Sequence, residues 1–177
     1  IRDEIAKSLG IVSEELPFVG ELVRVVDEKW EGAIERVLHS FALSLLVKDE
    51  YYDGVSSYVD STNLRGKLVY LKMIKNFKRE QYVDILPTSL LRKVEIKADS
   101  SLFEPLQMML NDRFNIPCVE TVDEFRRFKK ALTIHGQFKS SLSRHEKDDR
   151  FSISDKSQWL LGWDNLSKLK ALQTQEQ

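Results

Sequence analysis

The first half of the chain alternates short apolar runs with stripes of apolar residues at helical spacing. The runs are rich in aliphatic and β-branched residues, and they predict three strands, over residues 19–26, 44–47 and 67–73. From Trp30 to Phe41, apolar residues recur at i, i+3, i+4 and i+7, which predicts an amphipathic helix with Glu35 on its exposed surface. Asp49 is expected to cap a second helix. The predicted order is strand–helix–strand–helix–strand.

The second half repeats this order. Its apolar runs and stripes predict strands over residues 93–98, 116–119 and 131–134, and helices over residues 102–114 and from Thr121. The helices that begin at Trp30 and Leu102 lie 72 residues apart, and the buried strands that begin at 44 and 116 share this offset. The repeat predicts an α/β domain of two pseudo-repeated strand–helix–strand–helix–strand lobes.

Both ends of the sequence carry helical patterns. Ile1, Ile5 and Leu9 share one helix face, and leucines recur three residues apart between residues 165 and 177. Isolated helices of this length are marginal in water, so we expect truncated coiled-coil helices that flank the domain. A first residue other than Met favours a fragment of a longer protein. The expected parts are an incoming helix (1–16), a first lobe (17–85), a second lobe with a polar loop (86–160) and the start of an outgoing helix (161–177).

Composition narrows the class of protein. Hydrophobic residues make up 42 % and charged residues 31 % of the 177 residues, which is typical of a globular domain. Lys plus Arg is 27 and Asp plus Glu is 28, so a contact with DNA would have to come from a local basic patch. The single cysteine, Cys118, favours a buried thiol in a cytoplasmic protein. The sequence contains no apolar run of about 20 residues, so we expect no membrane contact.

The sequence shows no motif for catalysis or for a cofactor. Its glycines form neither of the two common phosphate-binding loops, and its three histidines stand outside metal-binding spacings, so we expect no cofactor and no metal. Residues 144–150 (RHEKDDR) alternate in charge within a polar segment. Such a run is usually a solvated loop, and contact with a partner or DNA is the second interpretation. Catalysis by this loop is the third, because no nucleophile accompanies it.

Basic residues gather in a few places along this near-neutral chain. They are the candidates for DNA phosphate contacts, with an ordinary solvated face as the alternative. The DNA-contact candidates are Arg65, Lys72, Lys75, Lys78, Arg79, Arg144, Lys147 and Arg150.

Several of these segments resemble the hinge domain of SMC-type ATPases. Residues 19–25, 30–38 and 45–47 are similar to the first strand, the "ExAIExAL" helix and the short "VVV" strand of such hinges. Residues 133–136 (TIHG) resemble the "TLDG" turn of the second hinge lobe. The resemblance implies a non-enzymatic homodimerisation module, carried by arms that lead to distant ATPase heads.

Three stretches narrow the resemblance to the JetC family of Wadjet systems, relatives of the MukB and MksB condensins. They are residues 30–36 (WEGAIER), 63–70 (NLRGKLVY) and 143–150 (SRHEKDDR). This resemblance implies a loop-extruding complex with other subunits that restricts plasmids, associated with plasmid or nucleoid DNA in the cytoplasm. A hinge of a MukB/MksB-type chromosome condensin is the alternative within this class. A small nucleotide-acting enzyme that uses the 144–150 loop is the alternative from another class.

The strands that end each half are the expected dimer seam. Lys67–Met73 and Ala131–Phe138 are expected to expose sheet edges, and a free edge invites pairing with a second chain. SMC hinges carry glycines after the "TLDG" turn, whereas this chain has Ser140, Ser141 and Ser143 there, which predicts a different seam. The dimer-interface candidates are Lys67, Leu68, Val69, Tyr70, Leu71, Leu132, Ile134, Gly136 and Phe138.

Overall fold

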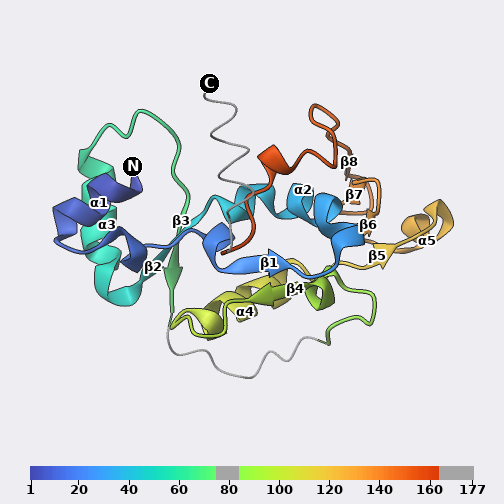
Figure 1. The fold of residues 1–177 in the computed structure, drawn as a ribbon, viewed down its shortest axis with the longest axis horizontal. Coiled ribbons are helices and arrows are strands. Elements are labelled where there is room, and N and C mark those ends of the chain that lie inside the picture. The colour runs from blue at the N-terminus through green and yellow to red at the C-terminus, as the bar shows by residue number, and fades with distance from the viewer. Residues whose placement is uncertain (75–83, 164–177) are drawn as a thin grey trace.

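The computed structural model describes residues 1–74 and 84–163 (Figure 1). The strands are β1 (Val23–Val25), β2 (Leu45–Lys48), β3 (Tyr70–Met73), β4 (Val94–Ile96), β5 (Cys118–Val119), β6 (Ala131–Thr133), β7 (Phe138–Lys139) and β8 (His145–Glu146). The α-helices are α1 (Arg2–Leu9), α2 (Glu31–Ala42), α3 (Asp49–Ser61), α4 (Phe103–Arg113) and α5 (Val122–Arg127). Short 3-10 turns are η1 (Ser13–Glu15), η2 (Val19–Glu21), η3 (Glu28–Trp30), η4 (Leu90–Lys93) and η5 (Lys156–Gln158).

The two halves of the chain repeat one unit about a central pair of strands. β1–α2–β2–α3–β3 is followed by β4–α4–β5–α5–β6, and in each half the last two strands are parallel. The first strands of the halves pair with each other antiparallel, with Arg24 opposite Glu95 at the middle of the register. Figure 1 shows this pair at the centre, β2 and β3 to its left, and β5 to β8 to its right. The α/β fold of two pseudo-repeated lobes is therefore confirmed.

Three apolar cores hold these parts together. The largest lies between α2 and α4, where Phe41 and Phe114 bring their rings to 5.0 Å. A second core joins α1, α3 and the inner face of β2 around the fully buried Ile5 and Val55. A third, small core lies under α5 around Phe125. Burial of these faces drives the assembly, since apolar area removed from water is the main favourable term in folding.

Three predicted strands are shorter or more broken than expected. Residues 19–21 form the turn η2 because the Glu21 carboxylate accepts the Phe18 N–H at 2.9 Å, so β1 begins only at Val23. The strand predicted over 67–73 begins at Tyr70. The strand predicted over 131–134 is β6, but the seam segment predicted over Ala131–Phe138 is not one strand, because a turn at Gly136, whose φ is +87°, separates β6 from β7.

The structure also tests where the predicted helices begin. Asp49 is the first residue of α3 and its side chain makes no cap hydrogen bond, so the predicted cap is wrong. Thr121 accepts the Glu124 N–H at the start of α5, as a capping residue does. The outgoing helix predicted over 165–177 lies outside the described residues. None of the described helices is long and apolar enough to cross a bilayer.

Candidate functional site

The first candidate surface is the outer edge of β3. Among the described residues, β3 pairs only with β2, so its other edge has no strand partner there. Lys67 and Val69 are exposed just before the strand, and Val69 keeps 43 % of its surface. Leu68 and Tyr70 are half-buried against the core around α3, and Leu71 packs against the central core. The structure thus leaves two exposed apolar side chains for a partner at the ends of this strand, Val69 before it and Ile74 after it.

The second half offers a different edge from the one predicted. β6 lies between β5 and β7, so it is an inner strand and the edge predicted for it is wrong. Leu132 is fully buried in the central core, and Gly136 is buried in the turn, so neither presents side-chain surface. Ile134 and Phe138 are half-buried and pack against the same core. The two edge strands of this sheet are β5 and β8; β5 has the bridge Ser89–Pro117 beside it, and β8 is the edge that follows the β7 hairpin.

A serine-rich hairpin presents the β8 edge. β7 and β8 pair antiparallel, and the Ser140 N–H donates to the Arg144 carbonyl at 3.0 Å to close the loop between them. The Ser141 hydroxyl oxygen accepts the Arg144 N–H at 3.1 Å. The hairpin leaves Leu142 with 71 % of its surface exposed, the largest fraction among the exposed large hydrophobic residues of the described chain. A single leucine among serines was the available sequence signal for this surface.

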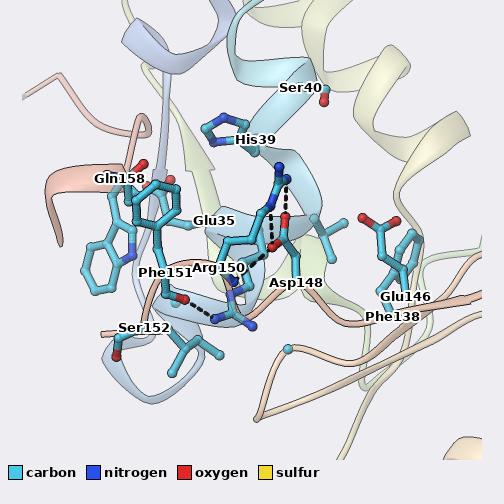
Figure 2. Close-up of a pocket in the computed structure, with 16 residues that line it drawn as sticks. Glu35, His39, Ser40, Phe138, Glu146, Asp148, Arg150, Phe151, Ser152 and Gln158 are labelled. Atoms are coloured by element: carbon cyan, nitrogen blue, oxygen red, sulfur yellow. Dashed lines mark hydrogen bonds and ion pairs between the residues drawn. The ribbon is translucent and has the colours of Figure 1, made fainter. Parts of the chain in front are cut away.

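A cavity of about 310 Å³ lies between α2 and the segment that follows β8 (Figure 2). His39 and Ser40 line it from α2, while Asp148, Arg150 and Phe151 line it from the opposite side. The 144–150 segment is therefore not a simple solvated loop, because part of it forms the wall of a concave site.

The charges around this cavity neutralise one another. The Arg36 guanidinium donates to the Asp149 carboxylate at 3.0 Å and to the Phe151 carbonyl at 2.8 Å. Arg150 donates to both carboxylate oxygens of Asp148, at 2.9 and 2.6 Å (Figure 2). These hydrogen bonds hold the pKa of Asp148 well below its usual range and raise the pKa of Arg150. Each shift stabilises the charged form, so neither group is tuned to exchange a proton near neutral pH.

The DNA-contact candidates fall into three groups. Arg144, Lys147 and Arg150 each pair with an acidic neighbour, and Lys72 lies 3.4 Å from Asp49 and over the Tyr52 ring. Arg65 is exposed in the turn before β3. Lys75, Lys78 and Arg79 lie outside the described residues. The described candidates do not gather into one patch of unbalanced positive charge.

Among the described residues, neither a cluster of metal-binding side chains nor the single cysteine provides a further site. The described residues contain no group of three or more His, Cys, Asp and Glu side chains that could hold a metal ion. Cys118 is buried, and burial raises the pKa of its thiol to about 12. A thiol with so high a pKa carries almost no thiolate at neutral pH and is a poor nucleophile.

Glu35 is buried, although the sequence predicts that its side chain is exposed. Glu35 was expected on the exposed surface, but it retains only 2 % of its surface in the structure. Its carboxylate accepts the N–H groups of Leu160 and Leu161 at 2.8 and 2.9 Å. Its place one step from the apolar stripe of α2 gave no sign of these partners, which lie far along the chain.

Comparison with protein families and with curated proteins finds no match. The solved hinge domain of the Pyrococcus furiosus SMC protein is similar, with a TM-score of 0.60 and 21 % identity over 83 % of this chain and 78 % of that chain. A Geobacillus stearothermophilus SMC hinge domain, solved as an asymmetric dimer, gives 0.54 and 17 % over 99 % and 71 %. A structure of the folded elbow of cohesin gives 0.65 and 16 %, where this chain spans a quarter (25 %) of the cohesin chain. The chain therefore has the fold of an SMC hinge domain.

Proposed function

We propose that this chain is the homodimerisation hinge of an SMC-like ATPase. The observation that carries the proposal is the hinge fold itself, with an outer strand edge in each half of one chain. The Geobacillus hinge, which has the same fold, was solved as a dimer. Two different edges on one chain suit a twofold pair in which the first-half edge of one copy meets the second-half edge of the other, because both contacts then close.

Each of the two edges carries an exposed apolar side chain that a partner could cover. Val69 is exposed beside β3, and Leu142 is exposed in the hairpin that leads into β8. Burial of these two side chains in a shared seam would favour association, since apolar area would be removed from water. β3 and β8 lie in different parts of the molecule in Figure 1, so one partner can engage both edges only by spanning the central strands.

The parent protein that we propose is a loop-extruding SMC-like subunit of a Wadjet plasmid-restriction system, located with plasmid or nucleoid DNA in the cytoplasm. The proposal is supported by the resemblance of residues 30–36, 63–70 and 143–150 to the JetC family. A MukB/MksB-type condensin is the alternative parent. Deleting the gene separates the two, since loss of plasmid restriction indicates the first and loss of chromosome segregation the second. DNA contact by the hinge is a secondary, weak role that should fall steeply with added salt.

Solution mass by light scattering after gel filtration tests dimerisation. We expect a mass of twice 20.6 kDa that persists on dilution. Leu142→Asp and Val69→Asp should each shift the mass toward the monomer, because a charge would be buried at the seam. Val26→Asp is the matched control, since Val26 is also an exposed apolar residue but lies at the end of β1. A monomer at every concentration, or equal effects of all three variants, would reject the proposed seam.

A further inference from the structure

The segment that follows β8 crosses α2 without forming a strand against it. We call residues 148–162 the strap; its one regular element is the short turn η5. Three neighbouring positions on one face of α2 contact it: Gly32, Glu35 and Arg36, which are spaced i, i+3 and i+4. The remaining faces of α2 include the apolar stripe that packs in the central core. One face of α2 thus packs in the central core, and another face contacts the strap.

The first contact depends on the absence of a side chain. A Cβ placed on Gly32 would lie 2.2 Å from the Ile153 carbonyl oxygen, closer than any real contact allows. The backbone of the strap therefore rests directly on the helix at this point. Arg36, one turn further along, fixes the same part of the strap through Asp149 and the Phe151 carbonyl.

The second contact is the buried carboxylate of Glu35. Burying a carboxylate is costly unless hydrogen bonds replace its water, and here two backbone N–H groups, of Leu160 and Leu161, do so. Leu161 is itself buried in the central core, so this point of the strap is fixed from both sides. Both of these contacts from the Glu35 carboxylate go to the backbone of the strap.

The strap ends beside the first strand of the chain. The Gly162 N–H donates to the Gly20 carbonyl at 2.9 Å, and a Cβ on Gly20 would lie 2.5 Å from the Leu160 carbonyl oxygen. The next residue, Trp163, stacks on the guanidinium of Arg24 at 4.4 Å. The position of the strap's end, at Gly162 and Trp163, is therefore set by contacts to residues 20–35.

The second half has no counterpart of this arrangement. The position equivalent to Glu35 in α4, 72 residues later, is Gln107, and the position equivalent to Gly32 is Glu104; both side chains are exposed. The strap site is thus a property of α2 alone and not a by-product of the repeated core.

We infer that the strap is a conformational link between the outer strand β8 and the exit of the chain at Trp163, and that Glu35 is the positioning residue that fixes this exit. The anchoring of the strap by Glu35 is supported by the hydrogen bonds and close contacts described above. The further statement, that docking of a second copy at β8 tightens the strap, rests on the proposed function.

Amide hydrogen exchange of the full chain tests the anchoring. The measurement is made on monomeric protein, with the Leu142→Asp substitution present in every variant compared. In Glu35→Gln, exchange at Leu160 and Leu161 should accelerate about ten- to a hundredfold, because a neutral amide oxygen replaces a carboxylate that accepts two N–H groups. Glu104→Gln, on the equivalent helix, should leave both amides unchanged. Unchanged exchange in Glu35→Gln, or an equal acceleration across all core amides, would overturn the positioning role.

Comparison of monomer and dimer tests the link. Protection at Leu160 and Leu161 should rise on dimerisation of the wild-type chain, and the rise should vanish in Gly32→Ala, in which the strap cannot rest on α2. A dimer in which these amides exchange as in the monomer would overturn the link and leave the proposed function intact. A chain that never dimerises would remove the proposed function and the link together, while the anchoring is still decided by the monomer experiment.

Discussion

Helices α2 and α4 occupy equivalent places in the repeat, yet they differ in what their outer faces contact. Their inner faces match, with Ile34 and Leu106, and likewise Leu38 and Leu110, buried 72 residues apart. Their outer faces diverge, because α2 carries the strap on Glu35 whereas the equivalent Gln107 is exposed. The comparison teaches that the repeated positions of α2 and α4 build the shared core. The outer faces of the two helices differ because the strap packs on α2 and not on α4.

The largest effects are expected where the two helices are alike. Ile34→Ala and Leu106→Ala each remove a fully buried side chain from the central core. Each should lower the free energy of unfolding by about 2–5 kcal/mol, since the lost burial and the cavity left behind add together. Urea denaturation followed by circular dichroism measures both values. A negligible loss for one variant beside a full loss for the other would show that the halves do not share one core.

A smaller effect should separate the two helices. Alanine is normally favoured over glycine inside a helix by about 1 kcal/mol. Gly32→Ala should nevertheless destabilise the chain by about 1–3 kcal/mol, because the added methyl meets the Ile153 carbonyl and the strap must move. Gln107→Ala on α4 is the control and should change stability by no more than about 0.5 kcal/mol. If Gly32→Ala stabilises the chain, the strap does not rest on α2.

The smallest effect is a pH dependence confined to the strap. Hydrogen bonds from Lys147 and then from Arg36 lower the pKa of Asp149. Because the folded pKa lies below the unfolded one, the contact contributes fully above the ordinary aspartate pKa of about 3.9 and is lost as pH falls through the folded value. Amides 149–153 should therefore lose exchange protection on acidification more in the wild type than in Asp149→Asn, after correction for intrinsic rates.

The control region for this pH effect is α4. Amides in the middle of α4 should show the same acid response in the wild type and in Asp149→Asn. Asp149 is the exposed partner of this ion pair, while Arg36 is partly buried, so added salt should weaken the difference without abolishing it. An acid response in wild type identical to that of Asp149→Asn would remove Arg36–Asp149 from the contacts that hold the strap.

The sequence predicts this fold best where apolar residues keep a helical spacing over several turns. Helix α2 spans three turns with a continuous apolar stripe, and its place and its partner α4 were both predicted. Strand β8 was missed because two residues in a polar hairpin carry no periodic signal. Residues 19–21 are predicted as strand because they lead into the aliphatic run of residues 22–26, but the local hydrogen bond from the Phe18 N–H to the Glu21 carboxylate holds them in a 3-10 turn.

The candidate site was harder to predict than the fold. The burial of Glu35 depends on Leu160 and Leu161, which are more than 120 residues away in sequence, and no local pattern reports such a partner. The prediction treats Ala131–Phe138 as one terminal strand with a free edge, whereas the turn at Gly136 divides it into β6 and β7, which pair with each other. The first error concerns a contact between distant segments, which one sequence alone does not reveal; the second concerns a short hairpin whose turn lies within an apolar stretch.

The contact between Gly20 and Gly162 brings two distant points of the chain within hydrogen-bond distance. The segment between them, which includes both repeated halves, therefore begins and ends at the same point of the molecule. Residues 1–19 are not part of this loop, although Ile5 and Leu16 are fully buried in the second core. A rotation about the Gly20–Gly162 contact would therefore also have to move the incoming segment and the core that it shares with α3.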